Sequence, residues 1–262
     1  MKMKKETIKY IFCSLLLGAA VLLSGAEKPI KVALAGSSAC QGFRSGDPKL
    51  IWGWGEVIGQ YFTKDVKILN FAISGRSTKS FILKKNWDKL LKSKPDYILM
   101  TLGANDTKGK KYATTLEEYR KNLLRFAADA EKINAKIIFV TLNQSLYTNK
   151  KKNIVYFPPH GPLRKDRAPY SKVMREVAAQ LKKPCLELFD RQYEIMKEMG
   201  EKECVKLYRY DKNGRIDGSH TNKAGAELLA KIIVDELRKS ASPLKKYTLD
   251  PKLKVPSTPV KK

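Results

Sequence analysis

Short apolar segments alternate along this chain with segments of helical periodicity. The near-continuous apolar runs that predict strands are residues 31–35, 66–72, 96–102, 136–142 and, more weakly, 185–189. The segments in which apolar residues recur at helical spacing are 56–62, 78–91, 116–133, 169–181 and 223–237. Apolar strands separated by amphipathic helices require a parallel sheet that is covered on both faces. We therefore predict an α/β fold, a three-layer α/β/α sandwich.

The two ends of the chain differ in composition from its middle. Residues 1–26 combine a basic head, an apolar run and small residues, which is typical of a cleavable export signal; an uncleaved anchor is the alternative. The apolar run is short for a bilayer span, and no cysteine follows it as a lipoprotein anchor would require. Residues 27–239 suit one domain. Residues 240–262, rich in lysine and proline, are expected to form an extended tail that does not join the core.

The chain is strongly basic. Its 52 Lys and Arg outnumber 26 Asp and Glu, giving a net charge of +26, and loss of the four Lys and one Glu in residues 1–26 leaves +23. Such an excess favours anionic partners such as acidic polysaccharide, and export makes nucleic acid the least expected of them. A general bias towards lysine with no specific partner is the alternative. We expect a monomer with no membrane span after signal removal.

Three cysteines remain after the predicted signal, namely Cys40, Cys185 and Cys204. An odd number leaves at least one thiol free, although a disulfide between Cys185 and Cys204 is possible. None of the three has the spacing of metal ligands. We therefore expect neither a metal nor a cofactor.

Small and polar residues follow three of the predicted strands where each strand ends. Ser38, Gly75 and Asn105 lie after the first, second and third strands, and Asp217 and His220 lie in a polar turn before the last predicted helix. Because the working residues of parallel sheets gather at the carboxyl ends of the strands, we expect these side chains to meet at one edge. Each residue alone could be a turn or capping residue, but their joint placement favours a catalytic set.

In this order, the four blocks resemble those of the SGNH, or GDSL-type, hydrolases, which are named for a Ser, a Gly, an Asn and a His. Gly53-Trp54-Gly55, residues 70–77 and Trp87-Asp88 are similar to the rhamnogalacturonan acetylesterase branch. The resemblance covers roughly residues 31–237. It implies a five-stranded parallel sheet of flavodoxin-like order and the hydrolysis of carboxylic esters.

The resemblance also implies a role for each residue. Ser38 would attack an ester carbonyl, His220 would take its proton, and Asp217 would orient the imidazole. The backbone N–H groups of Ser38 and Gly75 and the side-chain amide of Asn105 would form the oxyanion hole.

Two positions depart from the family pattern. Ser37 stands where the family usually has Asp, and Ala104 stands where the branch usually has His. These departures leave three alternatives open: an altered substrate preference, a loss of catalytic activity, and the use of Ser37 instead of Ser38 as the nucleophile.

A long basic and aromatic connection, residues 143–168, is predicted to form one wall of the cleft. Tyr156 and His160 within it, together with Arg76, are candidate substrate-binding residues. A solvated lysine run, a structural His160, and an Arg76 that holds its own loop are the alternatives. Trp54 and Trp87 are expected in the core.

These observations predict an exported serine esterase that removes acetyl groups from carbohydrate. The expected substrate is an acidic polysaccharide such as rhamnogalacturonan. One alternative is a lysophospholipase or general short-chain esterase, because the same catalytic group serves lipid esters. The other is a non-catalytic protein that binds polyanions on the same fold.

Overall fold

The computed structural model describes residues 28–253 except 45, 48, 108, 110, 150–153, 157–163 and 212, with the backbone alone at 147–149 and 154–156. The predicted export signal and residues 254–262 lie outside these ranges. None of the helices in the described ranges is long and apolar enough to cross a bilayer.

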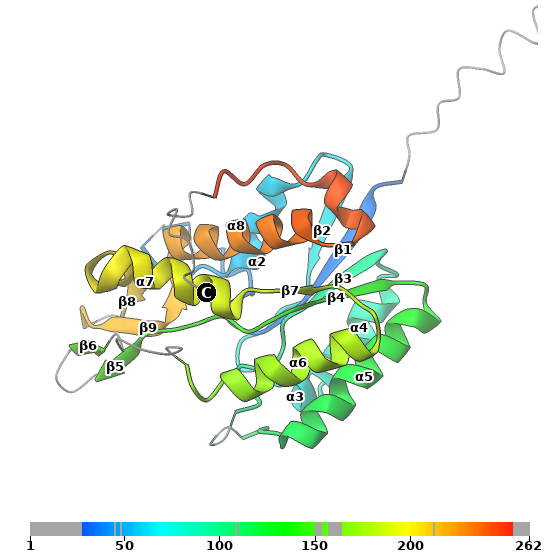
Figure 1. The fold of residues 1–262 in the computed structure, drawn as a ribbon, viewed down its shortest axis with the longest axis horizontal. Coiled ribbons are helices and arrows are strands. Elements are labelled where there is room, and N and C mark those ends of the chain that lie inside the picture. The colour runs from blue at the N-terminus through cyan, green and yellow to red at the C-terminus, as the bar shows by residue number, and fades with distance from the viewer. Residues whose placement is uncertain are drawn as a thin grey trace, which may run out of the picture.

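Five parallel strands form the central sheet, in the order β2-β1-β3-β4-β7 (Figure 1). They are β1 (Ile30–Ala35), β2 (Val66–Asn70), β3 (Tyr97–Met100), β4 (Lys136–Val140) and β7 (Cys185–Leu186). The strand order reverses between β1 and β3, and open α/β sheets bind ligands at such a point. The predicted α/β/α fold and flavodoxin-like sheet are confirmed; β1 begins one residue earlier than predicted, and the other four strands are shorter than predicted.

Side chains of β1 alternate between the two faces of the sheet and so contribute to two cores. Val32 and Leu34 pack in the first core and Ala33 and Ala35 in the second. The helices on the first face are α2 (Trp54–Val57), η1 (Ile58–Tyr61) and α8 (Lys223–Lys239). Those on the second are α3 (Thr78–Leu83), α4 (Asn86–Lys92), α5 (Leu116–Lys132) and α6 (Ala168–Gln180), which Figure 1 shows on the opposite side of the sheet from α8.

The two tryptophans of the resemblance belong to these cores, as expected. Trp54 is fully buried on the first face and Trp87 on the second. Trp87 also packs against Phe126 of α5 and donates from its indole N–H to Asp129 at 3.2 Å. Neither ring is therefore exposed to stack on a sugar.

Two helical regions differ from the prediction. The expected helix at residues 78–91 is divided, because Lys85 adopts a left-handed φ of 55° between α3 and α4. A long helix that the sequence analysis did not predict, α7 (Phe189–Val205), follows β7 directly. Gly200 interrupts its helical geometry with a φ of 74°, and its first residue had been placed in the weak fifth strand.

Two antiparallel hairpins complete the described fold beside the main sheet. One joins β5 (Tyr147–Asn149) to β6 (Ile154–Tyr156), and the other joins β8 (Tyr208–Tyr210) to β9 (Ile216–Thr221). Figure 1 shows both hairpins at the same end of the molecule. The N–H of Leu146 donates to the carbonyl of Gly218 at 2.8 Å and so connects them.

The segment after α8 packs on the domain, so the expectation that it stays apart from the core is wrong for residues 240–253. Leu244, within η2 (Pro243–Tyr247), is fully buried in the first core. The N–H of Thr63 donates to the carbonyl of Tyr247, and the N–H of Leu249 to that of Tyr61, both at 2.8 Å. Tyr247 and Leu253 pack against the same core, but exposed lysines lie between these residues in sequence, so composition alone suggests a detached tail.

The three cysteines in the described ranges are all free, so the possible Cys185–Cys204 disulfide is not formed. Cys40 and Cys204 are buried, and Cys185 is partly buried. The thiol of Cys204 lies 3.0 Å from the carbonyl oxygen of Met196, to which it donates.

Candidate active site

Ser37 and Ser38 lie in a tight turn directly after β1. The carbonyl of Ser37 accepts hydrogen bonds from the N–H groups of Cys40 and Gln41, each at 3.0 Å, which closes the turn. Ser37 is only 4% exposed, whereas Ser38 is half-buried. The turn therefore leaves Ser38 the more accessible of the two hydroxyls.

The backbone of Gly53-Trp54-Gly55 packs directly against this turn. A Cβ on Gly53 would lie 2.2 Å from the carbonyl oxygen of Gln41, and one on Gly55 would lie 2.3 Å from that of Cys40. The N–H of Trp54 donates to the carbonyl of Ala39 at 2.9 Å. Glycine is required here because the backbone of α2 approaches the serine turn more closely than any side chain would allow.

A polar pocket of about 160 Å³ lies where the turns after β1 and β3 meet β9. Residues that are distant in sequence share its walls, so Ser38, Asn105 and His220 meet in one cavity, as the sequence predicts. The full lining is Ser37, Ser38, Ala39, Ala104, Asn105, Asn143, Arg164, Arg167, Ser219 and His220.

Asp217 and His220 lie on strand β9, not in the polar turn that the sequence suggested. The pairing of Thr221 with Tyr208 and of Ile216 with Tyr210 draws this turn-like sequence into a strand. Nδ1 of His220 lies 2.8 Å from Oδ2 of Asp217. The predicted pair is therefore in hydrogen-bonding contact.

The Asp217 carboxylate is ionised at neutral pH. Burial acts to raise its pKa, but the hydrogen bond and charge of His220, the N–H of Ser219 and the guanidinium of Arg209 together hold the pKa well below its usual range. An ionised carboxylate only accepts hydrogen bonds, so Nδ1 of His220 carries the hydrogen. In the neutral ring, Nε2 is then the nitrogen that can take up a proton.

Arg209 is a member of this cluster that the sequence analysis did not identify. Its Nε lies 2.8 Å and its Nη2 2.7 Å from Oδ2 of Asp217, the same oxygen that contacts His220. The β8–β9 hairpin places Arg209 opposite Asp217, and no local sequence pattern signals that contact.

The turns that carry Gly75 and Asn105 are joined by a hydrogen bond. Gly75 has a φ of 73°, which glycine adopts readily and other residues rarely do. Nδ2 of Asn105 donates one of its two N–H groups to the carbonyl of Arg76 at 3.1 Å. The second N–H can donate to another acceptor. Gly75 itself is exposed and is not among the residues that line the pocket.

Asp106, directly after Asn105, is fully buried and holds these two turns together. Its carboxylate accepts the N–H of Thr78 at 2.9 Å, the hydroxyl of Thr78, and the hydroxyl of Thr114 at 3.0 Å. Burial raises the pKa of Asp106 to about 6, because desolvation outweighs these neutral hydrogen bonds. No sequence pattern around Asp106 indicates this role.

Of the three candidate substrate residues, only Arg76 has a described side chain, and it lies away from the pocket lining. Nε of Arg76 donates to the side-chain oxygen of Asn86 at 2.9 Å, and Arg76 does not line the cavity, so its guanidinium holds its own loop. The side chain of Tyr156 and the whole of His160 lie outside the described residues. Their predicted contact with substrate stays a prediction.

Both ends of the long connection predicted as a cleft wall do line the pocket, through Asn143, Arg164 and Arg167. Arg164 binds Asp166 through Nε at 2.8 Å and Nη2 at 2.6 Å, and it reaches the hydroxyl of Ser145 at 2.8 Å. Arg167, only 7% exposed, donates from Nη1 to the carbonyl of Asn143 at 2.7 Å. This wall is cationic.

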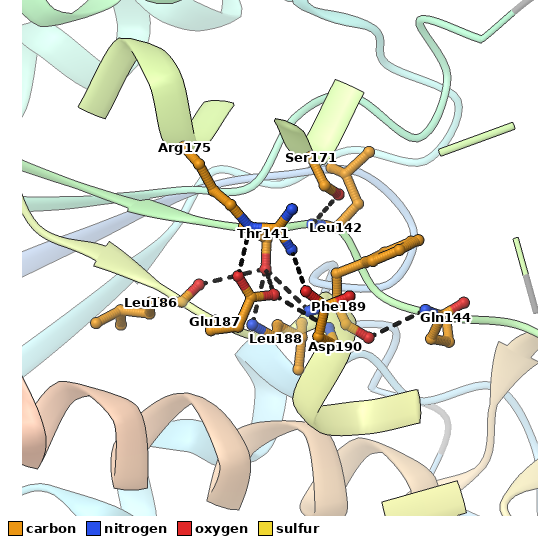
Figure 2. Close-up of polar contacts among 10 residues, drawn as sticks. All are labelled: Thr141, Leu142, Gln144, Ser171, Arg175, Leu186, Glu187, Leu188, Phe189 and Asp190. Atoms are coloured by element: carbon orange, nitrogen blue, oxygen red, sulfur yellow. Dashed lines mark hydrogen bonds and ion pairs between the residues drawn. The ribbon is translucent and has the colours of Figure 1, made fainter. Parts of the chain in front are cut away.

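A polar network behind this wall fixes the start of the connection (Figure 2). The hydroxyl of Thr141, just after β4, accepts the N–H of Phe189 at 2.9 Å and donates to Glu187 at 2.8 Å. Arg175 of α6 binds the same Glu187 at 2.6 Å. Three residues after Thr141, the side-chain amide of Gln144 donates to the carbonyl of Phe189 at 3.0 Å. The segment leading to the pocket is thus anchored to both α6 and α7.

The class of protein follows from this fold and site together with a family match. The model of the GDSL-like lipase/acylhydrolase family matches residues 32–233 of the chain. The chain therefore belongs to this family and is a carboxylic ester hydrolase, as the resemblance implied.

Two curated relatives and one solved structure are similar to most of the chain. The chain is similar to the rhamnogalacturonan acetylesterase RhgT of Bacillus subtilis, with 27% identity over 233 residues that cover 84% of this chain and 95% of the relative. A probable rhamnogalacturonan acetylesterase of the same organism, YesY, is 26% identical over 217 residues, covering 80% and 94%. The solved acetylxylan esterase Axe2 of Geobacillus stearothermophilus shares the fold, with a TM-score of 0.57 and 18% identity, covering 79% and 93% of the two chains.

Proposed function

We propose that this enzyme is a serine esterase that removes O-acetyl groups from carbohydrate. The observation that carries the proposal is the single polar pocket in which Ser38, Asn105 and His220 meet, with Asp217 hydrogen-bonded behind the imidazole. The names of its curated relatives support an acetylated carbohydrate as the substrate.

In the proposed reaction, the Ser38 hydroxyl attacks the ester carbonyl and passes its proton to Nε2 of His220. The Ser38 hydroxyl has no hydrogen-bond partner among the described residues, so it is free to rotate towards Nε2. The imidazolium then gives this proton to the departing alcohol, which leaves Ser38 acetylated. A water molecule attacks the acetyl-enzyme with His220 again as base, and acetate and free Ser38 result.

Developing negative charge on the carbonyl oxygen would be met by the N–H groups of Ser38 and Gly75 and by the second side-chain N–H of Asn105. Removing one such donor typically costs about a hundredfold in rate. The hydrogen bond from Asn105 to Arg76 supports this assignment, because it fixes the amide beside the turn that contains Gly75.

The choice of Ser38 over Ser37 follows from exposure. Ser37 is 4% exposed and its carbonyl closes the turn, whereas Ser38 is half-buried and open to the pocket. Ser38→Ala should therefore abolish turnover, and Ser37→Ala, a matched removal of one hydroxyl in the same turn, should leave most of it.

The size of the pocket favours a short acyl group. Its volume of about 160 Å³ is below the roughly 300–1,000 Å³ of pockets that enclose whole drug-sized ligands. An acetyl group fits such a space and a long fatty acyl chain does not. The alternative of a lysophospholipase is disfavoured on this ground.

The alcohol part of the substrate is proposed to be an acidic polysaccharide such as rhamnogalacturonan. Two guanidiniums, Arg164 and Arg167, line the pocket, and Arg164 pairs with the carboxylate of Asp166. Guanidinium groups bind carboxylates strongly, so a uronate next to the acetylated sugar would be attracted to this wall. The net charge of +26 acts in the same direction at longer range.

The reaction is tested by hydrolysis of 4-nitrophenyl acetate. We expect Ser38→Ala and His220→Ala each to lower kcat by at least about a thousandfold, and Ser37→Ala to lower it by less than about tenfold. Equal rates in wild type, Ser38→Ala and His220→Ala would remove the proposed catalytic set.

The polymer is tested by measuring acetate release from acetylated pectin, acetylated xylan and a phospholipid at two salt concentrations. We expect pectin to be preferred, and the preference to weaken with salt because exposed charges are then screened. A salt-independent preference for neutral xylan would overturn the acidic substrate while leaving the esterase reaction in place.

We also propose that the enzyme is exported through residues 1–26. A basic head before an apolar run and small residues supports this. The N-terminal sequence of the protein recovered from the periplasm or medium of an expressing bacterium tests it; an intact Met1 on a protein retained in the cytoplasm would contradict it.

A further inference from the structure

Three nitrogen donors converge on one oxygen of the Asp217 carboxylate. Oδ2 lies 2.8 Å from Nδ1 of His220, 2.8 Å from Nε of Arg209 and 2.7 Å from Nη2 of Arg209. Among the described residues, the other oxygen, Oδ1, accepts the N–H of Ser219 alone, at 3.1 Å. The imidazole and the guanidinium therefore share a single acceptor atom.

We propose that Arg209 is a positioning residue of the catalytic set, which clamps the Asp217 carboxylate and places a second cation on the oxygen that His220 uses. This rests on the proposed function, in which His220 is the base. Arg209 does not line the pocket, so it acts through Asp217 and does not touch the substrate.

The clamping part of the proposal follows from geometry. Two N–H groups of one planar guanidinium converge on Oδ2, and they fix the position of this oxygen better than one contact from a flexible ammonium would. Side-chain exposures of 29% for Arg209 and 11% for Asp217 place the ion pair at the edge of the interior, where solvent screens it only partly. The hairpin β8–β9 supplies both residues, so the pair forms wherever the hairpin forms.

The electrostatic part follows from the shared oxygen. When His220 takes the Ser38 proton it becomes an imidazolium, and Arg209 then competes with it for the same negative charge. Arg164 and Arg167 are the other charged groups lining the pocket, and Asp166 partly balances them. A nearby cation disfavours a second cation, so removing the Arg209 charge should favour the protonated form of His220.

The chain contains a matched control for this arrangement. Arg215, in the same hairpin, contacts Oδ2 of Asp211 through Nε at 3.0 Å and Nη2 at 2.9 Å. This is the same two-point contact on one carboxylate oxygen, but the Asp211 carboxylate has no contact with a histidine in the described structure. Arg215→Met therefore removes the same charge and the same kind of ion pair without touching the catalytic set.

The experiment compares the pH dependence of kcat/KM for wild type, Arg209→Met, Arg209→Lys and Arg215→Met, with 4-nitrophenyl acetate as substrate. The acid limb of such a profile reports protonation of the free enzyme's base. We expect Arg209→Met to move this limb up by about one pH unit, which lowers the rate roughly tenfold on the acid side. Arg209→Lys should keep the limb near its wild-type position but lower the plateau kcat, with little change in KM.

Arg215→Met should leave both the limb and the plateau unchanged. Superimposable profiles for wild type and Arg209→Met would overturn the proposal. Equal shifts in Arg209→Met and Arg215→Met would also overturn it, since a general charge effect would then explain both.

A second measurement does not depend on turnover. The chain has only two histidines, so a His160→Gln background leaves one imidazole, and its NMR titration can be followed with and without Arg209→Gln. An upward shift in the pH midpoint on removing Arg209 supports the proposal, and an unchanged midpoint overturns it. If the wild type has no esterase activity, the proposed function fails, while this titration still decides the role of Arg209.

Discussion

Asp217 and Asp106 are two buried aspartates that stand directly behind residues of the same pocket, yet their surroundings differ in one respect. Asp217, behind His220, is held by the imidazole and by the guanidinium of Arg209, and its pKa lies well below the usual range. The carboxylate of Asp106, beside Asn105, accepts hydrogen bonds from neutral groups of Thr78 and Thr114 among the described residues, and burial raises its pKa to about 6.

The difference shows how partner charge decides what a buried carboxylate can do. Cationic partners keep Asp217 ionised, so it can stabilise an imidazolium as that charge develops. Neutral partners orient Asp106 without fixing its charge. We interpret Asp106 as a structural tie between the turns that carry Gly75 and Asn105, and Asp217 as an electrostatic participant in the reaction.

The largest effect expected from this comparison is on turnover. Asp217→Asn should lower kcat by on the order of ten-thousandfold, because an amide can hold the wrong tautomer of His220 and cannot stabilise its cation. Asp106→Asn, the same change of one oxygen to nitrogen, should lower kcat by no more than about tenfold. Steady-state kinetics on 4-nitrophenyl acetate compares the two, and losses of similar size would contradict the division of roles.

The next effect concerns the donor beside Asp106. Asn105→Ala should lower kcat by about a hundredfold with little change in KM, because the donor acts on charge that develops only in the transition state. Asn122→Ala is the control: its amide donates to the hydroxyl of Thr78 at 2.9 Å, outside the pocket. A loss confined to KM would show that Asn105 binds the ground state instead.

Stability should depend on pH in opposite directions at the two sites. For Asp106, the folded pKa of about 6 exceeds the unfolded value of about 4, so the folded state binds more protons between these limits. The free energy of unfolding should therefore fall as pH rises from about 4 to about 7, by roughly 2–3 kcal/mol from this group. Urea unfolding of wild type and Asp106→Asn measures it; the variant should lack this component.

For Asp217 the sign is reversed. Its folded pKa lies below the unfolded value of about 4, so its stabilising contribution is present above that pH and is lost as the pH falls further. The difference in unfolding free energy between wild type and Asp217→Asn should therefore shrink on acidification below about pH 4. A difference that grows on acidification would contradict the ion-pair account.

Much of the fold could be predicted because each core strand is a short apolar run and each main helix has a clear apolar stripe. Helix α7 could not be predicted, because its first residue lies in the weak strand predicted at residues 185–189 and because Gly200 interrupts its helical geometry. The packing of Leu244 could not be predicted, because the few core contacts of its segment are separated by exposed lysines and leave no periodic signal. Both failures concern contacts that tertiary packing decides.

The site shows the same limit. Ser38, Asn105 and His220 could be placed together because strand ends of a parallel sheet converge. Asp217 and His220 were expected in a turn, since Asp, Gly and Ser favour turns, and only pairing with Tyr208 and Tyr210 makes them a strand. Arg209 could not be found because its role exists only once that hairpin has formed.

The three free cysteines in the described ranges should react slowly with thiol reagents while the protein is folded. Burial raises the pKa of Cys40 well above its usual range and the pKa of Cys185 and of Cys204 to about 12. The thiolate is the reactive species, and its fraction at these three cysteines should be very small in the native state, so oxidants and alkylating agents should react with them slowly. Modification of Cys40, directly below the serine turn, would then report global opening of the molecule, and its rate would measure how often that opening occurs.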